Sequence, residues 1–392
     1  MNRLPKYGLF IIPLIINIFF ISGYEPEVVS GSDPVEYQII ASNILQRLDF
    51  FDGRSYAFRP PLYPFFISVV FAVMGKFTFN IFIAQAITAA LSAVLIYQAA
   101  KLLSGKLAAI TAWYLMILNP YTLLFCKQVL RTNLIIFWLS AFLCLILYAR
   151  INKYKKLYQS LFFGFTCGLG ALLAPSVMPW IIAYWVIVIF DKGFKLGDRI
   201  KWALLSMVVF SVVVSPWFLR NYQLFKTPVF VSSCGFNFYV GNNPYSNGTF
   251  HMPHIEDFSD QERKDEVSMD RAILKKSLDY CKRNPLATIQ RIPAKIYYFF
   301  ESPANPLLNL FDIILTIAFL FSLYIAKDYP DSRYKFLLWP FLLRFVVVMV
   351  FFSTWRYRVE VYPFIYIFIS MVLAKHLIKK YNIQIYKDDL RV

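Results

Sequence analysis

Carboxylates, arginines and amides recur beside long apolar segments, at positions that would all lie on one side of a membrane. These side chains are Asp33, Glu36, Arg59, Arg131, Arg220, Asn221, Asn242, Asn243, Glu301, Arg356 and Arg358. A carboxylate can take a proton from a nucleophile, and arginines can bind a phosphate through paired hydrogen bonds. Gathered on one face, these residue types predict a polar site for proton transfer and phosphate binding.

Asp33 stands at the start of a predicted helix, and two roles are open to it. As a structural residue it caps the helix, because Pro34 suits the first helical position and Glu36 completes a pattern like a capping box. As a functional residue it is a general base or a metal ligand at the membrane surface. The roles are compatible, because a capped helix start holds a carboxylate rigidly.

The arginines also have two interpretations. Two prolines follow Arg59 and fix the backbone, so its guanidinium has a defined direction and suits phosphate. Alternatively, an arginine at the end of an apolar segment extends its charge toward lipid headgroups. Outer-face arginines run against the usual topology bias, so several at one depth predict an anion site. The arginines at span ends are Arg131, Arg220, Arg356 and Arg358.

Two further groups of residues leave alternatives open. Asn242 and Asn243, between Gly241 and Pro244, either form a turn or offer amides to sugar hydroxyls. Cys234 and Cys281 fall in one outer segment, and the sequence does not decide whether they pair. The 3 histidines are too scattered for a zinc site.

The composition identifies a polytopic membrane protein. Of 392 residues, 58% are hydrophobic and 19% aromatic, and the mean hydropathy is +0.53. The net charge is +17, but many Lys and Arg residues stand in short loops between apolar segments and at the termini. They are topology signals and contacts for anionic lipid, so we expect no binding of nucleic acid.

Apolar runs and loop charges predict the topology. The segment 62–75 is short and follows prolines, so it is predicted to lie at the membrane surface. The loops assigned to the cytoplasm are then short and basic, as the positive-inside rule requires, and both termini are cytoplasmic. No cleavage site follows the first span. The ten predicted spans are 7–23, 80–100, 106–119, 131–149, 158–174, 176–190, 201–219, 306–326, 335–352 and 360–377.

The chain divides into a transmembrane catalytic module (1–219, with a first outer loop at 24–79), an outer-face domain (220–305), and C-terminal spans with a basic tail (306–392). In the outer loop, a helix at 34–48 is predicted to have an apolar side. That side consists of Val35, Ile39, Ile40, Ile44 and Leu48.

Helices are also predicted in the outer-face domain. One covers 260–283, with Ser259 as its cap, and the next covers 285–300 and ends beside Glu301. No internal repeat is evident, and an inverted repeat would have favoured a transporter.

At these motifs the sequence resembles the GT-C fold glycosyltransferases that use polyprenyl-phosphate sugars. They are the bacterial relatives of protein O-mannosyltransferases and of the lipid A aminoarabinose transferase, a group like glycosyltransferase family 39. The resemblance covers about residues 5–375 and depends on the order and spacing of individually weak motifs. These are Ser32-Asp33…Tyr37, Arg59-Pro60-Pro61-Leu62-Tyr63-Pro64, Pro216-Trp217…Arg220-Asn221-Tyr222, Gly241-Asn242-Asn243-Pro244, Glu301…Asn305 and Arg356-Tyr357-Arg358…Pro363.

The resemblance implies an all-α GT-C-like bundle and an inverting transfer from a polyprenyl-phosphate sugar to a lipid, glycan or protein. The site would face outward from the cytoplasmic membrane of a bacterium, which the few cysteines, short loops and Lys/Ile/Phe bias also favour. Asp33, helped by Glu36, would be the catalytic carboxylate, directly or through a divalent metal ion. Arg59, Arg131, Arg220, Arg356 and Arg358 would bind the donor phosphate. Tyr37, Tyr63, Asn221, Asn242, Asn243 and Glu301 would bind substrate.

Two departures from the resembled family keep other functions open. Relatives usually carry a carboxylate near the start of the fourth span, where this chain has Arg131-Thr132-Asn133. Relatives often have Arg-Pro after the fifth span, where this chain has Ala174-Pro175. The departures favour one alternative, a catalytically inactive homologue that binds glycans. The other alternative, a transporter or lipid flippase, requires charged or broken helices near mid-membrane, where only Arg344 comes close.

Overall fold

The computed structural model describes residues 7–23, 32–151, 156–191, 193–250, 258–259, 265–302, 305–329 and 331–382. No strand occurs in these ranges, and helices make up most of them. The start of the predicted first outer loop (24–31) and part of the predicted basic loop at 150–156 lie outside the described residues.

Helices occupy all ten predicted spans. They are α1 (Gly8–Ser22), the two halves of α4 (Thr78–Ile117), α6 (Thr132–Ile151), α7 (Lys156–Leu173), α8 (Met178–Phe190), α9 (Leu196–Phe225), α14 (Pro306–Ala326), α15 (Ser332–Val350) and α17 (Tyr362–Lys380). Five of them, α4, α6, α9, α14 and α17, are long and apolar enough to cross a membrane. The other apolar helices are shorter, and they include α3 (Leu62–Met74), which the sequence predicted at the surface.

A break in α4 separates the second and third predicted spans. Ser104 and Gly105 have non-helical backbone angles, and Gly105 has a φ of +78°, which favours glycine. Beside the break, Arg333, at the start of α15, donates to the carbonyl of Leu103 at 2.5 Å. The segment labelled α4 therefore consists of two helices joined at a bend.

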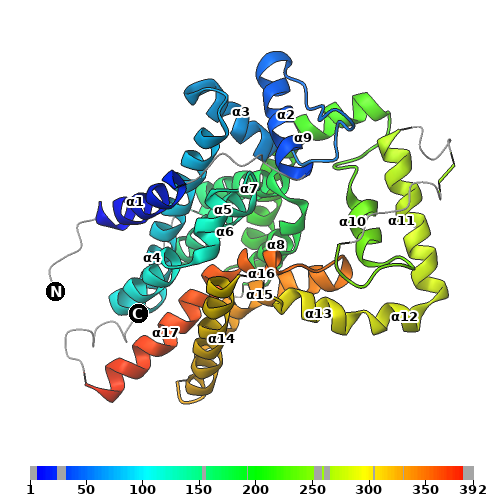
Figure 1. Ribbon diagram of the computed structural model, residues 1–392. Helices are drawn as coiled ribbons and strands as arrows, with labels where there is room; N and C mark the ends of the chain where they lie inside the picture. The colour runs from blue at the N-terminus through cyan, green and yellow to red at the C-terminus, as the bar shows by residue number, and fades with distance from the viewer. Residues whose placement is uncertain are drawn as a thin grey trace.

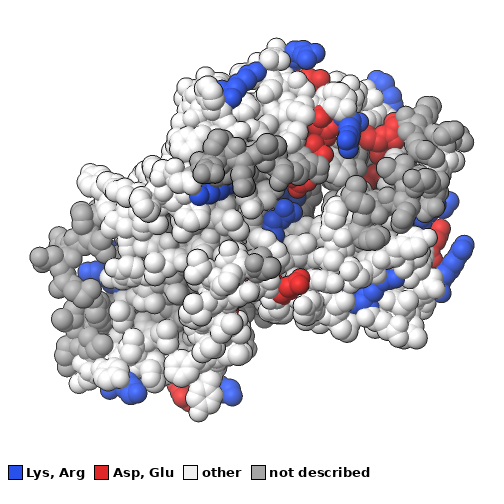
Figure 2. Space-filling view, viewed as in Figure 1, with Lys and Arg blue, Asp and Glu red and all other residues white. Residues whose placement is uncertain are grey.

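The core of the bundle lies around α4 and α17. Most side chains of α17 are buried, and α4 packs against α1, α6 and α17 (Figure 1). In contrast, α9 and α14 are mostly exposed, as expected for helices that face lipid. The surface over α1, α14 and α17 is mostly free of charge, whereas acidic and basic groups gather toward the opposite half of the molecule (Figure 2).

Small residues allow α7 and α9 to approach closely. A Cβ atom added to Gly164 would lie 2.4 Å from the backbone oxygen of Ser206, and one added to Gly168 would lie 2.6 Å from Cβ of Val213. Membrane helices often pack through small residues four positions apart, because the backbones can then touch.

The outer segments contain shorter helices. The first holds α2 (Ser32–Arg47), close to the predicted 34–48, and the second holds α10 (Cys234–Gly241), α11 (Glu266–Arg283), α12 (Pro285–Gln290) and α13 (Ile292–Phe300). The remaining elements are α5 (Pro120–Cys126), a 3₁₀ turn (Pro175–Val177) and α16 (Trp355–Val359). Figure 1 shows the second outer segment extending to one side of the bundle. Cys234 and Cys281 are free thiols.

Two details of the predicted helices are wrong. The helix predicted at 260–283 begins at Glu266, because Asp265 caps it by accepting from the amides of Val267 and Ser268, and Ser259 does not. The predicted apolar side of α2 is only partly buried. Its Ile40 and Ile44 face the core, but Val35, Ile39 and Leu48 are exposed, and Tyr37 and Ala41 complete the buried side.

Candidate active site

One arginine joins the two carboxylates of α2. Arg59, which precedes α3, donates from Nη2 to Asp33 Oδ1 at 2.6 Å and from Nε to Glu36 Oε2 at 2.7 Å. Asp33 and Glu36 are one helical turn apart, so both face the same guanidinium. The Arg59 side chain is only 13% exposed, which strengthens its interaction with the carboxylates.

Further arginines surround Asp33. Nη1 of Arg356, on α16, lies 4.0 Å from Asp33 Oδ2, and the charge of Arg131, just before α6, also acts on Asp33. Burial opposes ionisation of Asp33, but these three arginines outweigh it and hold the pKa of its carboxyl below the ordinary value. Asp33 is therefore an anion at neutral pH. The pKa of Arg59 lies above its ordinary value, because its acidic neighbours outweigh its burial.

Two buried tyrosines and a glutamine support this cluster. The rings of Tyr37 and Tyr63 meet edge to face, 4.8 Å between centroids, and Cζ of Arg59 lies 5.3 Å from the centroid of Tyr37. The Tyr63 hydroxyl donates to Oε1 of the buried Gln85 at 2.8 Å. Nε2 of Gln85 donates to the carbonyl of Gln128 at 2.9 Å, and thereby connects the tyrosines to the loop before Arg131. The sequence analysis did not single out Gln85.

A buried ion pair adjoins Tyr357, the residue after Arg356. Arg344 of α15 pairs with Glu360, and both side chains are almost completely buried. The Cζ atom of Arg344 lies 5.2 Å from the ring of Trp180 and 5.3 Å from that of Tyr357, and Arg356 lies 5.6 Å from the same Tyr357 ring. An ionisable residue in an apolar helix signals function or pairing, and Arg344 carried that signal in the sequence.

Arg358 belongs to a separate ion-pair network. It donates from Nη2 to Asp312 Oδ2 of α14 at 2.6 Å and from Nη1 to the Phe299 carbonyl at 3.1 Å. Tyr362 donates to Asp312 Oδ1 at 2.6 Å, and Tyr121 also donates to Asp312. The sequence predictions missed Asp312, although it is the one acidic residue in the apolar segment 306–326.

Arg220 and Asn221 join the end of α9 to the segment before α3. Arg220 donates to the carbonyl of Tyr56 at 2.8 Å and stacks on Trp217, with 5.0 Å between its Cζ and the ring centroid. Asn221 is buried and donates to the carbonyl of Phe230 at 3.1 Å. Neither side chain is brought to Asp33 by the contacts described.

Asn242 and Asn243 bond within the protein. Asn242 donates to the Val350 carbonyl at 2.8 Å and accepts from Nζ of Lys295 at 2.9 Å. Asn243 donates to the Tyr239 carbonyl at 2.8 Å, so it closes the turn after α10. Glu301 directly follows α13 and is half-buried. Of the predicted site residues, the structure therefore gathers Asp33, Glu36, Tyr37, Arg59, Tyr63, Arg131 and Arg356.

The carboxylates do not form a metal site as they are placed. No group of three or more His, Cys, Asp or Glu side chains suited to a metal ion occurs within the described part of the chain. Asp33 and Glu36 both direct an oxygen at Arg59, so a guanidinium stands where a shared cation would bind. In this arrangement the two carboxylates pair with Arg59, and the divalent ion stays a prediction.

Comparison with known proteins identifies the fold. The sequence model of the family described as dolichyl-phosphate-mannose-protein mannosyltransferase matches residues 58–219, which include Arg59, Tyr63 and Arg131 but not Asp33. No curated protein matches the sequence.

Solved structures are similar over nearly the whole chain. The Archaeoglobus fulgidus oligosaccharyltransferase in its apo form has 15% identity and a TM-score of 0.59, covering 99% of this chain and 52% of that one. The same archaeal enzyme, AglB, in complex with an inhibitory peptide and a dolichol-phosphate has 13% identity, a TM-score of 0.58 and coverages of 98% and 51%. This chain thus spans about half the length of these structures.

A third structure is ArnT from Cupriavidus metallidurans bound to undecaprenyl phosphate. It has 13% identity and a TM-score of 0.46, and the match covers 97% of this chain and 80% of that one. From the family match and the oligosaccharyltransferase structures, we conclude that the chain has the GT-C fold.

Proposed function

We propose that the chain is an inverting glycosyltransferase that moves a sugar from a polyprenyl-phosphate donor to an acceptor lipid, glycan or protein. The main support for this proposal is the position of Asp33. Its carboxylate contacts Arg59, lies 4.0 Å from Arg356 and is affected by the charge of Arg131. A half-buried carboxylate among cations supplies both a base and phosphate-binding groups. We place this site at the outer face of the cytoplasmic membrane of a bacterium.

Asp33 acts as the general base in the proposed step. Its Oδ1 accepts a hydrogen bond from Arg59, so we assign Oδ2 as the atom that takes the acceptor's proton. As Oδ2 takes the acceptor's proton, the acceptor's lone pair forms a bond to the anomeric carbon. The bond from that carbon to the phosphate oxygen breaks on the opposite side, which inverts the configuration. The electron pair leaves with the polyprenyl phosphate, whose anion is stable enough to depart without a strong general acid.

The phosphate is assigned to Arg131 and Arg356. Both are half-buried and adjoin Asp33, whereas Arg220 donates to a backbone carbonyl and Arg358 pairs with Asp312. In this proposal Arg59 holds Asp33 ionised and oriented, with its charge beside the phosphate. Preorganised cations of this kind stabilise the negative charge that develops on the leaving group.

Two comparisons support a lipid-phosphate donor. The matched family is described by its use of dolichyl-phosphate-mannose, and the similar oligosaccharyltransferase has been solved with dolichol-phosphate. The apolar surfaces of α9 and α14 supply lipid-facing helices beside which a polyprenyl chain can lie. The predicted transporter alternative gains no such support.

The proposal is tested by sugar transfer in lipid nanodiscs. Purified protein is mixed with a polyprenyl-phosphate sugar and an extracted acceptor fraction. Wild type should transfer sugar, and Asp33→Asn should lose about 10²–10⁴-fold in rate, the usual contribution of a general base. The matched control is Asp198→Asn, which changes an exposed carboxylate at the start of α9 and should keep the wild-type rate.

Other outcomes would contradict the proposal. Undiminished transfer by Asp33→Asn would remove this carboxylate from the mechanism. Saturable donor binding by wild type, without transfer to any acceptor, would instead favour the inactive glycan-binding homologue.

A further inference from the structure

Two short helices of the outer segment present apolar side chains at the surface. Leu286 and Ile289 of α12 are 67% and 61% exposed, and Tyr297 of α13 is 61% exposed. The other side of α13 is buried in the protein, where Lys295 and Phe299 stand one turn apart. The remaining exposed apolar residues of the pair are Ile292, Ile296 and Phe300. Together these six side chains form an apolar face.

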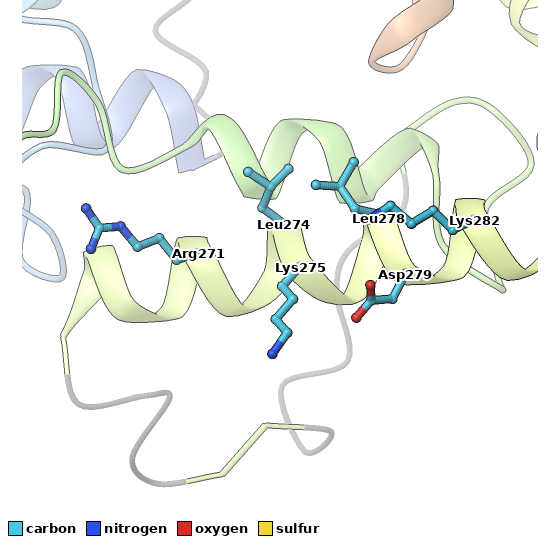
Figure 3. Close-up of a pocket in the computed structure, with 6 residues that line it drawn as sticks. All are labelled: Arg271, Leu274, Lys275, Leu278, Asp279 and Lys282. Carbon is cyan, nitrogen blue, oxygen red and sulfur yellow. The ribbon is translucent and has the colours of Figure 1, made fainter.

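The preceding helix has a different surface. A shallow groove along α11 is lined by Arg271, Leu274, Lys275, Leu278, Asp279 and Lys282 (Figure 3). Charges of both signs alternate with its leucines, as on a helix that faces water. In contrast, the sequence 285–300 contains no acidic residue. The change from a charged to an apolar surface occurs at Pro285, where α12 begins.

The apolar face continues into a membrane helix. Five residues separate the end of α13 from the start of α14, which is long and apolar enough to span a membrane. Its Leu307, Leu310 and Ile314 are 73%, 55% and 57% exposed. Figure 1 shows α13 and α12 running out of the bundle, across the direction of α14. The pair therefore leaves the bundle from the end at which α14 enters it.

We propose that α12 and α13 lie flat in the outer leaflet, with the apolar face among the lipid chains and anionic phospholipid as the partner. An interfacial helix of this kind buries its apolar side about 5–10 Å deep at the headgroup boundary. Lys282 and Arg283 are exposed at the outer end of the pair, where their charges meet anionic headgroups. Tyr297 and Tyr298 suit the same interface, because tyrosine combines an apolar ring with a polar hydroxyl.

The lipid-bound pair is connected to the rest of the protein through its buried side. Lys295 donates to the carbonyl of Met349, near the end of α15, at 2.8 Å. The carbonyl of Phe299 accepts from Arg358 at 3.1 Å, and Arg358 pairs with Asp312. Contact with the bilayer therefore fixes the position of the residues that adjoin α15 and α16.

Fluorescent labels can measure the depth of the pair in full-length protein. Cys234 and Cys281 are replaced by serine, and Ile289→Cys or Ile296→Cys is labelled with the NBD fluorophore. The matched control is Leu278→Cys, at a 40% exposed leucine of α11. Protein is placed in nanodiscs of phosphatidylcholine and phosphatidylglycerol. We expect spin-labelled lipid to quench positions 289 and 296, and dithionite to reduce them about tenfold more slowly than position 278, because the acyl region excludes the anion.

The result does not depend on catalytic activity, so it stands apart from the proposed glycosyl transfer. Equal reduction by dithionite at all three positions would overturn the proposal. So would protection that disappears when each disc holds one protein molecule, because a second copy would then be the partner. Protection without quenching by spin-labelled lipid would likewise place protein, not lipid, against the apolar face.

Discussion

Arg59 donates to the carboxylate of Asp33 at 2.6 Å, although 26 residues separate them in the sequence. The contact brings the first turn of α2 to the proline-fixed segment before α3, and Glu36 holds the same guanidinium. In the proposed mechanism, the base and its orienting cation are thereby preorganised before any substrate binds.

Removing the Arg59 charge should shift the pH dependence of transfer. Cations hold the pKa of Asp33 below its ordinary value. In wild type, Asp33 should therefore stay ionised down to acidic pH, and the rate constant should stay unchanged over the same range. In Arg59→Gln the effect of burial, which raises this pKa, is less opposed. The acid limb of the kcat/KM profile should therefore move to higher pH. Arg59→Lys retains the charge and should shift the limb less. Identical acid limbs in wild type and Arg59→Gln would contradict the assignment of Asp33 as the base.

Chelation of divalent ions should leave transfer unchanged. Arg59 already occupies the space between Asp33 and Glu36 and balances one of their two charges, and these carboxylates do not make a metal site as placed. Transfer measured with EDTA should equal transfer measured with Mg²⁺ or Mn²⁺, and calorimetry should detect no Mn²⁺ binding at this site. Activity lost in EDTA and restored by Mn²⁺ would show that the carboxylates rearrange around an ion.

Arg358 and Asp312 should stabilise the protein as a pair. Both side chains are at most 10% exposed, so Arg358→Met leaves a buried carboxylate without its cation. We expect a loss of about 3–5 kcal/mol in the free energy of unfolding. The double variant Arg358→Met/Asp312→Leu removes both charges and should regain much of that loss. Denaturant unfolding in detergent measures both.

The same double variant also tests the predicted phosphate role of Arg358. Donor affinity equal to that of wild type would exclude a contact between Arg358 and the donor phosphate. If the single and double variants were equally unstable, the ion pair would not be the source of the loss.

The buried Lys295 should make stability depend on alkaline pH. Burial lowers the pKa of Lys295 to about 8; the charge of Arg291 acts in the same direction, and Cys281 acts against it. In an unfolded chain, a lysine has a pKa of about 10.4. Between these values the unfolded chain binds more protons, so stability should rise with pH. The melting temperature at pH 9.5 relative to pH 8 should show this rise, and Lys295→Met should remove it. Lys282→Met, at an exposed position, should preserve the rise.

Much of the architecture was accessible from hydrophobicity and charge. Each predicted span contains a helix, and the helix carrying Asp33 begins within two residues of its predicted start. These features depend on local composition, which the sequence displays directly. The structure places four side chains together, namely Asp33, Arg59, Arg131 and Arg356. Their joint role in catalysis stays a prediction.

The rest depended on contacts between distant segments. The buried side of α2 is set by its packing against α3, so Tyr37 faces inward while Val35 is exposed. Hydrophobicity alone had assigned Val35 to the apolar side. The same limit concealed Gln85, a polar residue within an apolar helix whose partners come from α3 and the loop after α5.

The network around Asp312 has a consequence for biosynthesis. Ribosomes produce α14 before α16, and Arg358 follows Asp312 by 46 residues. The carboxylate therefore reaches the translocon while its cation is still unsynthesised, and an aspartate in a membrane helix costs about 2.5–3.5 kcal/mol to insert. Tyr121 and Ser302 are made earlier, and both donate to this carboxylate in the folded protein. Integration of α14 is thus completed only when the C-terminal helices arrive, so nascent chains halted before Arg358 should stay crosslinkable to the translocon.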